Sequence, residues 1–303
     1  MLDVVVIGAG MAGMTACLYA LRNGKKVLVL EKESVGGQIA KSPKVENYPT
    51  VKEISGSELS DQLFEQIIAL GAEFELEDVV GITKENNIFS IKTNYNAYQA
   101  KSVVVATGAK PRMLNLANEE NFVGHGIYYC AICDGPFFAG EEVTLIGDAN
   151  SALQYALMLS SYCKKVKMFT LFDKFFGEQA LQDKVRNTTN IEIVHEVCAI
   201  ELKGTDKLES IVFKKKDGTA FEHKTSAVFV AIGQIPDNQI YSNLVDLDKN
   251  GYIVSDERCL TKTAGLFVAG DCRTKEIRQV ATAIGDGAVA GTNACKYINS
   301  LGD

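Results

Sequence analysis

Two cysteines three residues apart are the residues of this chain best suited to chemistry. Cys130 and Cys133 enclose Ala131 and Ile132, and Asp134 follows directly. In a reducing compartment, a lone Cys-x-x-Cys pair is more often catalytic than structural, because its thiols cycle between dithiol and disulfide. The sequence therefore predicts a redox-active disulfide.

No metal site is expected. Zinc or an iron–sulfur cluster would need a second cysteine pair or nearby histidines, and the sequence has neither. The six other cysteines are scattered and are predicted to be small buried apolar residues. They are Cys17, Cys163, Cys198, Cys259, Cys272 and Cys295. His125, His195 and His223 have no partner visible in the sequence and are assigned no role.

A glycine-rich turn near the N-terminus predicts a dinucleotide site. Residues 4–7 and 27–30 have the apolar composition of buried parallel strands, and residues 14–23 are expected to form the helix between them. In such a turn, the first glycine allows the bend, the second admits a pyrophosphate, and the third lets helix and strand pack closely. Glu31, at the end of the second strand, suits a hydrogen bond to a ribose. The turn itself is Gly8, Ala9, Gly10, Met11, Ala12 and Gly13.

A second turn of this kind, in the middle of the chain, keeps the fold signals but lacks the cofactor chemistry. Strands are expected at residues 143–146 and 166–169, with a helix between them. Ala149 replaces the second glycine, and its Cβ would crowd a pyrophosphate. Asp148 adds negative charge, and residues 170–176 contain no arginine for a 2′-phosphate. No acid stands at the strand end for an NAD ribose.

Length and composition fit a globular protein of two domains. The chain has 303 residues, of which 47% are apolar and 23% charged. The net charge of −7 disfavours nucleic acid as a partner. No apolar run approaches the roughly 18 residues that would indicate a membrane span. The N-terminus lacks the basic region of a signal peptide, so we expect a cytoplasmic protein.

Four motifs, one of which contains the redox pair, indicate a family. In this order they resemble the low-molecular-weight thioredoxin reductases over essentially the whole chain, and a Cys-x-x-Cys in the central domain is distinctive of that branch. The motifs are Val45-Glu46-Asn47-Tyr48-Pro49, Ile54-Ser55-Gly56-Ser57-Glu58-Leu59, Tyr129-Cys130-Ala131-Ile132-Cys133-Asp134-Gly135 and Arg278-Gln279-Val280-Ala281-Thr282-Ala283.

The resemblance implies an α/β fold with two dinucleotide-binding domains, each Rossmann-like and three-layered, of the flavoprotein disulfide reductase type. Residues 1–112 and 243–303 would form a discontinuous FAD-binding domain. Residues 115–240 would form a central, NAD(P)H-binding-like domain that carries the redox pair. Members of this family are homodimers, and their central domain rotates, here about hinges near residues 110–114 and 234–243.

The resemblance also implies which residues bind FAD. Asp271 would hold the ribitol chain, and the helix that opens at residues 278–281 would face the pyrimidine end of the flavin. The full set is Gly8, Ala9, Gly10, Met11, Ala12, Gly13, Glu31, Lys32, Gly36, Gly37, Gln38, Asn47, Thr107, Gly108, Ala109, Gly270, Asp271, Arg278, Gln279 and Val280.

By the same resemblance, Cys133 accepts electrons from the flavin, and Cys130, the more exposed thiol, attacks the disulfide of thioredoxin. Asp134 would donate or accept the proton. The altered central turn resembles the members of the family that do not use pyridine nucleotides, so reduced ferredoxin is the expected donor. Ferredoxins near about −400 mV and thioredoxin near about −270 mV differ by roughly 6 kcal/mol for two electrons, which makes this direction downhill.

Two other functions stay open at this point. The chain could be an NADPH-dependent thioredoxin reductase with an atypical cofactor site, or a flavin-bound disulfide sensor that does not turn over NAD(P)H. Docking of an acidic ferredoxin would need a basic patch, and residues 164–167 and 214–216 are candidates. Phe172, Phe175 and Phe176 could fill the vacated nicotinamide space or belong to the core.

Overall fold

The chain folds into two compact units. The computed structural model describes residues 1–42, 45 and 47–302. Glu46, from the family motif over residues 45–49, lies outside the described residues. Unit 1 comprises Met1–Lys110 and Ile235–Asp303, and unit 2 comprises Pro111–Gln234. The chain passes between the units in β7 (Lys110–Pro111) and β16 (Gln234–Ile235), which pair as a two-stranded sheet.

The second crossing of the chain between the units lies earlier than the sequence predicts. Residues 235–240 are expected in the central domain, yet they group with unit 1. Tyr241, in the short helix η3 (Gln239–Tyr241), explains why: its ring is buried in the core of unit 1 with Val245 and Ile253. An apolar side chain of that size fixes the segment to the core that covers it.

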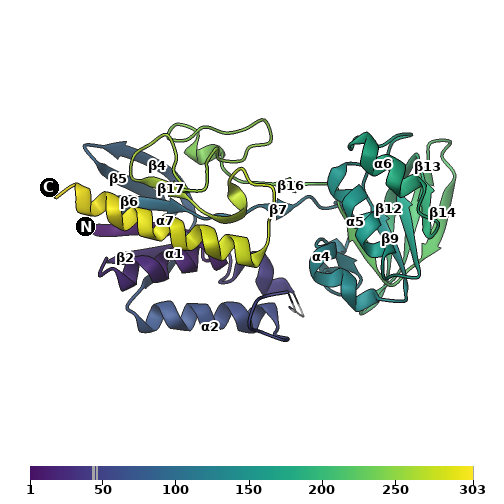
Figure 1. The fold of residues 1–303 in the computed structure, drawn as a ribbon, viewed down its shortest axis with the longest axis horizontal. Coiled ribbons are helices and arrows are strands. Elements are labelled where there is room, and N and C mark those ends of the chain that lie inside the picture. Colours follow the sequence, from purple (N-terminus) through teal and green to yellow (C-terminus); the bar gives the residue numbers. More distant parts are fainter. Residues whose placement is uncertain (43–44, 46, 303) are drawn as a thin grey trace. The chain divides into compact units, whose positions relative to one another are not determined.

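Unit 1 is built on a seven-stranded sheet of order β3-β2-β1-β6-β5-β4, with β17 paired to β6 (Figure 1). β1 pairs in parallel with β2 and β6, and β17 pairs in parallel with β6. The carboxyl ends of these strands, at Ile7, Glu31, Val105 and Val268, therefore lie at one edge of the sheet. Loops that leave this edge form the candidate cofactor site. The strands are β1 (Leu2–Ile7), β2 (Val27–Glu31), β3 (Glu73–Leu76), β4 (Val79–Glu85), β5 (Ile88–Thr93), β6 (Ala97–Val105) and β17 (Leu266–Val268).

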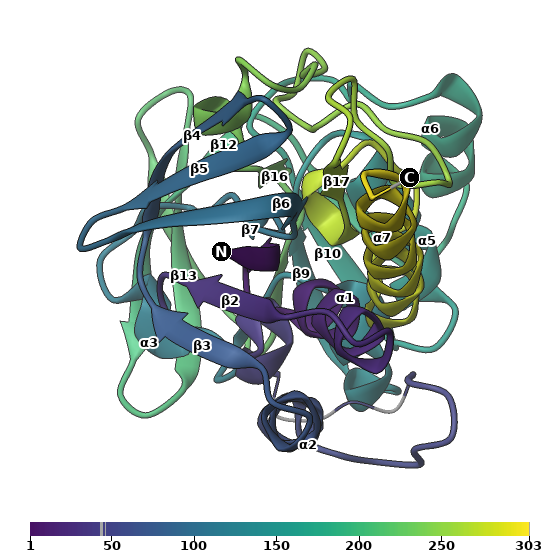
Figure 2. The same ribbon diagram turned by 90° about the vertical axis from the view of Figure 1, so that its left-hand side faces the viewer.

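Three helices cover one face of this sheet: α1 (Met11–Arg22), α2 (Gly56–Ala69) and α7 (Val280–Ser300) (Figure 2). α1 begins three residues earlier than predicted, because Gly10 already serves as its N-cap. α1 and α7 pack closely at glycines: a Cβ on Gly287 would lie 2.3 Å from Ala12 O, and one on Gly291 would lie 2.4 Å from Ala16 O. The short helices η1 (Gly37–Lys41) and η4 (Gly270–Cys272) lie at the candidate cofactor site.

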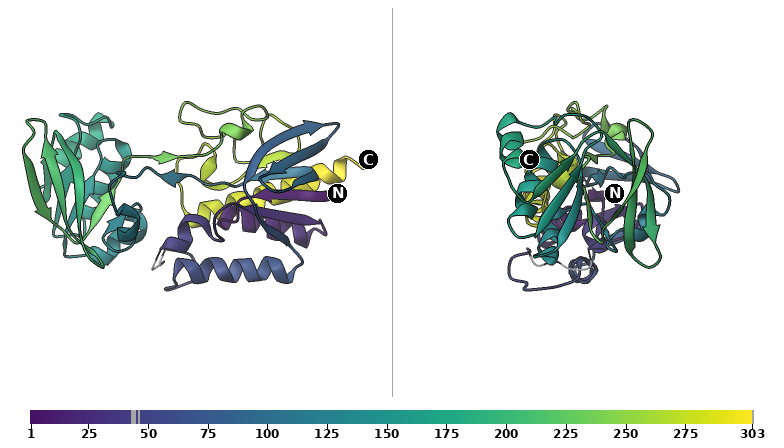
Figure 3. Two further views of the ribbon diagram at one scale, coloured as in Figure 1. Left: turned by 180° about the vertical axis from the view of Figure 1, so that it is seen from behind. Right: turned by 90° about the vertical axis from the view of Figure 1, so that its right-hand side faces the viewer.

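Unit 2 contains a parallel five-stranded sheet of order β11-β10-β9-β15-β8. α5 (Asn150–Ser160) and α6 (Gln179–Arg186) cover one face, and a three-stranded antiparallel sheet covers the other (Figure 3). The remaining elements are α3 (Glu119–Phe122), β8 (Ile127–Tyr128), α4 (Ala131–Asp134), η2 (Gly135–Phe138), β9 (Glu142–Ile146), β10 (Lys165–Phe169), β11 (Ile191–Val194), β12 (Val197–Gly204), β13 (Leu208–Lys215), β14 (Ala220–Lys224) and β15 (Val228–Val230).

Among the described residues, no helix combines the length and the apolar character that crossing a bilayer requires.

Candidate active site

The redox pair lies on one short helix of unit 2. Cys130 and Cys133 are joined by a disulfide bond, and Cys130 is the N-cap residue of α4. The backbone N–H of Cys133 donates a hydrogen bond of 3.2 Å to Cys130 Sγ. Such a donor favours the thiolate form of the sulfur it contacts. Both cysteines are half-buried.

Asp134 is the carboxyl group closest in sequence to the pair, and it is buried, with 8% of its surface exposed. Burial raises its pKa to about 7. Its charge in turn raises the pKa of Tyr128 and of Tyr155, although burial is the larger cause for both. A carboxyl group that titrates near neutral pH suits proton exchange with thiols.

Gly135 allows close packing directly after the acid. A Cβ at this position would lie 2.3 Å from the hydroxyl of Tyr162, at the end of α5. That hydroxyl is itself buried and has no hydrogen-bond partner among the described residues. The backbone at Gly135, directly after the redox helix, therefore packs closely against the end of α5 and the residues that follow it.

The other cysteines, except one, are buried, and two of the histidines lie within hydrogen-bond distance of threonine hydroxyls. Five of the six remaining cysteines are buried, as predicted, but Cys198 is exposed. Its neighbour Val197 faces the core, so the alternation of β12 turns Cys198 to the opposite face. His195 Nδ1 lies 2.7 Å from Thr170 Oγ1, and His223 Nε2 lies 2.9 Å from Thr144 Oγ1.

The N-terminal glycine turn has the geometry that its sequence predicts. Gly8 has a φ of +107°, and a Cβ there would lie 2.4 Å from Ala106 O. A Cβ on Gly13 would lie 1.9 Å from Gly8 O, so this glycine allows helix and strand to pack. Gly10 is different, because a Cβ there would meet only Gly36 O, at 4.0 Å. The space beside Gly10 is thus open within the protein, as a site for a pyrophosphate requires.

The acidic residue after β2 is tied to this turn. Glu31 Oε2 accepts a hydrogen bond of 2.8 Å from the backbone N–H of Ala9, and Oε1 accepts one of 2.8 Å from Glu33. Lys32 forms a salt bridge of 2.9 Å with Asp237. Its ammonium group is therefore already paired, which weakens the expectation that Lys32 contacts the cofactor.

The loop after Glu31 closes one side of the turn. Gly36 and Gly37 both have positive φ, at +93° and +63°, and the backbone N–H of Gly36 donates 2.8 Å to Ala9 O. The side-chain amide of Gln38 donates to Ala109 O. These contacts join the loop to the segment that follows β6.

That segment, residues 107–109, follows the carboxyl end of β6. Thr107 Oγ1 contacts Asn238 Oδ1 at 3.3 Å. Gly108 has a φ of +68°, and a Cβ there would meet nothing within 4 Å. The segment therefore faces open space at the strand ends.

Asp271 carries an orphaned buried acceptor. Its Oδ1 is buried and has no hydrogen-bond partner among the described residues. Burial raises the pKa of this carboxyl group, and the charges of Lys275 and Arg278 oppose that rise. A hydroxyl-rich chain such as ribitol would supply the missing donor.

The start of α7 completes the site. Val280 is the first residue of the helix, and Gln279 precedes it as N-cap. Asn47 Nδ2 donates 3.3 Å to Gln279 Oε1. Arg278 stacks over the ring of Tyr252 at 4.2 Å. Together with the open space at Gly10 and the unpartnered Asp271, the residues present fit FAD.

Sequence reasoning missed the residues that support this site. Asp286 in α7 accepts hydrogen bonds from Arg273 Nη2 at 2.7 Å, Lys275 Nζ at 2.9 Å and the backbone N–H of Gly270 at 3.0 Å. Asn238, 1% exposed, donates to Gly251 O and Cys272 O. No spacing rule links these residues, since their contacts join distant segments.

Comparison with known proteins decides the family. A family profile described as pyridine nucleotide-disulphide oxidoreductase matches residues 2–287. The thioredoxin reductase of Listeria monocytogenes is 36% identical over 301 residues, which are 99% of this chain and 94% of that protein. The thioredoxin reductase of Treponema pallidum is 37% identical, over 99% and 98%. The chain belongs to the low-molecular-weight thioredoxin reductases.

The crystal structure of thioredoxin reductase from Streptococcus pyogenes agrees, with a TM-score of 0.94, 34% identity and 99% of each chain covered. The family and the fold predicted from the sequence are confirmed, and FAD is the family's cofactor. Members are oxidoreductases that act on a disulfide.

In unit 2 of this chain, the loop after β10 is hydrogen-bonded to the central glycine turn. The backbone N–H of Phe176 donates 2.8 Å to Asp148 O. The backbone N–H of Glu178 donates 2.7 Å to Asn150 Oδ1, and Asn150 Nδ2 donates 3.3 Å to Glu178 Oε1. Gly177 lies so close that a Cβ there would be 2.4 Å from Leu153 Cδ1. The loop thus places Glu178 beside the start of α5, next to the turn that carries Asp148.

The three phenylalanines of this loop separate into two groups. Phe175 is 4% exposed and belongs to the core beneath α5 and α6. Phe172 and Phe176 are exposed, and their rings meet edge to face at 5.1 Å. Lys174, a cation of the loop, lies over the Phe176 ring at 5.5 Å. The exposed part of the loop therefore carries two aromatic rings and one lysine, and it contains no arginine.

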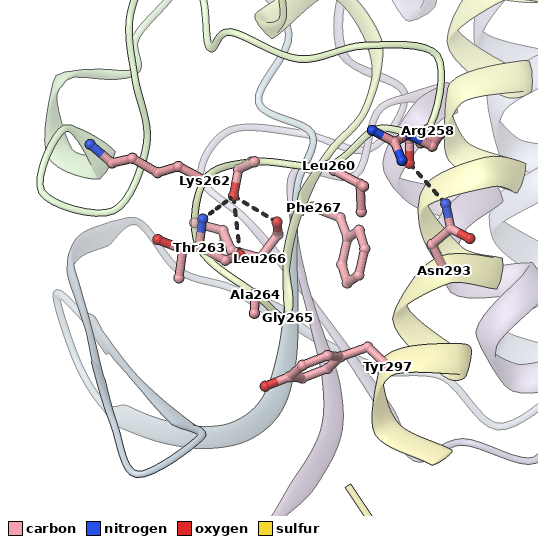
Figure 4. Close-up of a pocket in the computed structure, with 11 residues that line it drawn as sticks. Arg258, Leu260, Lys262, Thr263, Ala264, Gly265, Leu266, Phe267, Asn293 and Tyr297 are labelled. Atoms are coloured by element: carbon pink, nitrogen blue, oxygen red, sulfur yellow. Dashed lines mark hydrogen bonds between the residues drawn. The ribbon is translucent and has the colours of Figure 1, made fainter. Parts of the chain in front are cut away.

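A separate hollow of about 450 Å³ lies in unit 1 at the amino end of β17, the strand end opposite the cofactor site (Figure 4). Its two cations are already paired, Arg258 with Asp256 at 2.9 Å and Lys262 with Asp246 at 2.8 Å. This hollow brings together no catalytic groups, and we do not assign it to the active site.

Proposed function

We propose that this flavoenzyme reduces the disulfide of a thioredoxin-type protein through FAD and the Cys130–Cys133 pair, with electrons from reduced ferredoxin rather than from NADPH. The thioredoxin part is supported by relatives of nearly equal length that carry that name. The observation that carries the donor part is the loop over residues 171–178, which is hydrogen-bonded to the start of α5.

The redox pair would exchange disulfides in two steps. The Cys130 thiolate attacks one sulfur of the thioredoxin disulfide, which forms a mixed disulfide and expels the other thioredoxin sulfur as a thiolate. Cys133 then attacks Cys130 Sγ, which remakes the disulfide of the pair and releases the second thioredoxin thiolate. Asp134, with a pKa of about 7, would take the proton of the Cys133 thiol and pass it to a departing thiolate.

FAD, when bound, supplies the conversion between single electrons and the electron pair that a disulfide needs. This chain would hold it with the turn from Gly8 to Gly13, with the loop at Gly36 and Gly37, and with Asp271. The N-terminus of α1 has no side-chain cap, so its free N–H groups are available to the pyrophosphate. Glu31 would move from Ala9 N–H to a ribose hydroxyl, or share both.

Two features disfavour the use of NADPH. One is the loop over residues 171–178, which is hydrogen-bonded to the start of α5, and the other is the negative charge at the same place. A nucleotide phosphate at the start of α5 would meet Asp148, which is half-buried, and the Glu178 carboxylate. Burial raises the pKa of Asp148, which reflects the poor solvation of its charge. No arginine lies between residues 147 and 178 to balance a phosphate.

The two lysine clusters give little support as a ferredoxin-docking surface. Lys164 pairs with Glu142 at 3.1 Å, and Lys167 pairs with Glu192 at 2.9 Å. Lys216 pairs with Glu196 at 3.0 Å. Because carboxylates of the chain already pair with several of these lysines, the proposal does not place the donor there.

We further infer that the enzyme is a homodimer and that unit 2 rotates about β7 and β16 during turnover. A dithiol that must exchange electrons with FAD and then with thioredoxin needs access to each in turn. The two strands are the places where the chain passes between the units.

The second candidate function is an ordinary NADPH-dependent thioredoxin reductase, which the pyridine-nucleotide description of the family favours. Anaerobic flavin absorbance near 450 nm, followed on mixing with NADPH, NADH or reduced ferredoxin, separates the two. Bleaching by ferredoxin alone is the expected result. Rapid bleaching by NADPH would overturn the proposed donor, and bleaching by none of the three would favour a flavin-bound disulfide sensor.

A further inference from the structure

Unit 2 buries a carboxylate that has no role in the function proposed above. Glu119 is 2% exposed, and no salt bridge to it is found among the residues that the structure describes. Its Oε1 accepts 2.6 Å from the Tyr129 hydroxyl and 2.8 Å from the backbone N–H of Leu114. Its Oε2 accepts 3.3 Å from the backbone N–H of Leu116.

These three donors come from two segments of different kinds. Residues 114–116 follow closely after the passage between the units at Lys110 and Pro111. Tyr129 directly precedes Cys130, the N-cap residue of the redox helix. One carboxylate therefore joins the end of the inter-unit connection to the backbone that carries a redox cysteine.

Stability alone does not account for this arrangement. Leu114, Leu116 and Tyr129 pack against the apolar core between the two sheets of unit 2. Burying a carboxylate costs free energy that its hydrogen bonds only offset, and an apolar residue of similar size often serves a core as well or better. Burial and the hydrogen bond that Tyr129 donates to Glu119 both raise the pKa of Tyr129, so its hydroxyl remains a donor at all working pH values.

We propose that Glu119 is a positioning residue for the redox pair: through the Tyr129 hydroxyl, it fixes the backbone on which Cys130 is mounted. The fixed backbone keeps Cys130 Sγ where the Cys133 N–H reaches it, at 3.2 Å. It also keeps the two sulfurs close in the reduced protein, which raises their effective concentration for closing the disulfide. The proposal rests on the disulfide chemistry of the pair, but not on the identity of the electron donor.

The experiment measures the thiol–disulfide equilibrium of the holoenzyme in glutathione buffers, by alkylation of the free thiols and mass spectrometry. It requires neither ferredoxin nor NADPH nor thioredoxin. In Tyr129→Phe, the equilibrium constant for forming the Cys130–Cys133 disulfide is expected to fall about threefold to tenfold, and a tenfold fall equals about 30 mV. Glu119→Gln keeps one carbonyl acceptor, so its equilibrium constant for forming the disulfide is expected to fall less.

Tyr98→Phe is the matched control. Tyr98 donates a hydrogen bond of 3.2 Å to Glu77, a buried carboxylate of unit 1, so the same bond is lost far along the chain from the redox pair. It is expected to leave the equilibrium of the pair unchanged. Because Glu119 and Tyr129 act through one bond, the double variant should change the equilibrium by less than the sum of the two single changes.

Two results would overturn the proposal. One is a lower melting temperature in Tyr129→Phe with an unchanged glutathione equilibrium, which would make Glu119 a residue of stability alone. The other is full additivity in the double variant. If Glu119→Gln fails to fold, Tyr129→Phe, which removes a single oxygen atom, still decides the question. Failure of ferredoxin to reduce the flavin would leave this measurement unaffected.

Discussion

The backbone N–H of Phe176 donates a hydrogen bond of 2.8 Å to the carbonyl oxygen of Asp148. This bond joins the loop after β10 to the turn after β9. In a dinucleotide-binding domain that binds its cofactor, these two segments contact the nucleotide. With Glu178 bonded to Asn150 beside it, the loop supports the proposed loss of nicotinamide binding.

Restoring the missing glycine is expected to be insufficient for NADPH use. Ala149→Gly removes one Cβ, but it leaves the loop bonded to the turn, and Asp148 and Glu178 still oppose a phosphate. Anaerobic mixing with NADPH should therefore bleach the flavin of the variant no faster than that of the wild type. Fast bleaching would show that Ala149 alone had closed the site and would contradict the role given to the loop.

Gly10→Ala should separate protein stability from FAD binding. The protein leaves the Cβ position open, with Gly36 O at 4.0 Å, so the apoprotein should keep its melting temperature. The pyrophosphate approaches the backbone there, so the variant should be purified with much less FAD. Gly285→Ala, whose Cβ would meet nothing within 4 Å, is the control and should retain both. Normal FAD content in Gly10→Ala would place the pyrophosphate elsewhere.

Asp134→Asn should alter the pH dependence of catalysis. The pKa of about 7 means that the wild type loses the acidic proton as the pH rises through neutrality. Because Asp134 must be deprotonated to take the proton of the Cys133 thiol, thioredoxin reduction should rise along that limb in the wild type. In the variant it should be slower by about a hundredfold and lack the limb. Rates are measured with dithiol-reduced enzyme in single turnover. A variant with an unchanged pH profile would exclude Asp134 as the proton carrier.

The same group should affect stability with a defined sign. Its folded-state pKa is raised from 3.8 to about 7, so the folded protein binds a proton that the unfolded chain has lost between these values. Stability from this group therefore falls as the pH rises through that window. The difference in the free energy of unfolding between Asp134→Asn and the wild type should shift by about 2 kcal/mol in favour of the variant as the pH rises from 5 to 7. Denaturant titrations at several pH values measure it.

Asp286→Ala should destabilise the protein and weaken FAD retention. Burial alone would raise the pKa of Asp286, but hydrogen bonds from Arg273 and Lys275 outweigh it, and the pKa is lowered. Its removal leaves two buried cations unpaired, at a cost of about 3–5 kcal/mol, and frees Gly270 beside Asp271. Thermal unfolding and FAD loss on gel filtration report both effects. Asp246→Ala, which breaks an exposed pair with Lys262, should cost about 0–1 kcal/mol and retain FAD.

Much of this protein could be predicted from local sequence. The strand-turn-helix signal around Gly8 to Gly13 depends on neighbouring residues, as do the Cys130–Cys133 pair and the altered turn at Asp148 and Ala149, because steric and spacing constraints act over a few residues. The structure shows the tight turn and the close packing that these glycines predict, and α7 begins near Val280, as the sequence indicates.

Only the tertiary structure decided which distant groups meet. Glu119 and Tyr129, or Asp286 and Arg273, are brought together by the packing of elements whose contacts no spacing rule encodes. It also placed residues 235–240 with unit 1 through the buried ring of Tyr241, and it turned Cys198 outward on β12. Burial, charge pairing and pKa are properties of such assembled neighbourhoods, whereas the sequence alone specifies the local backbone and the chemical groups available to it.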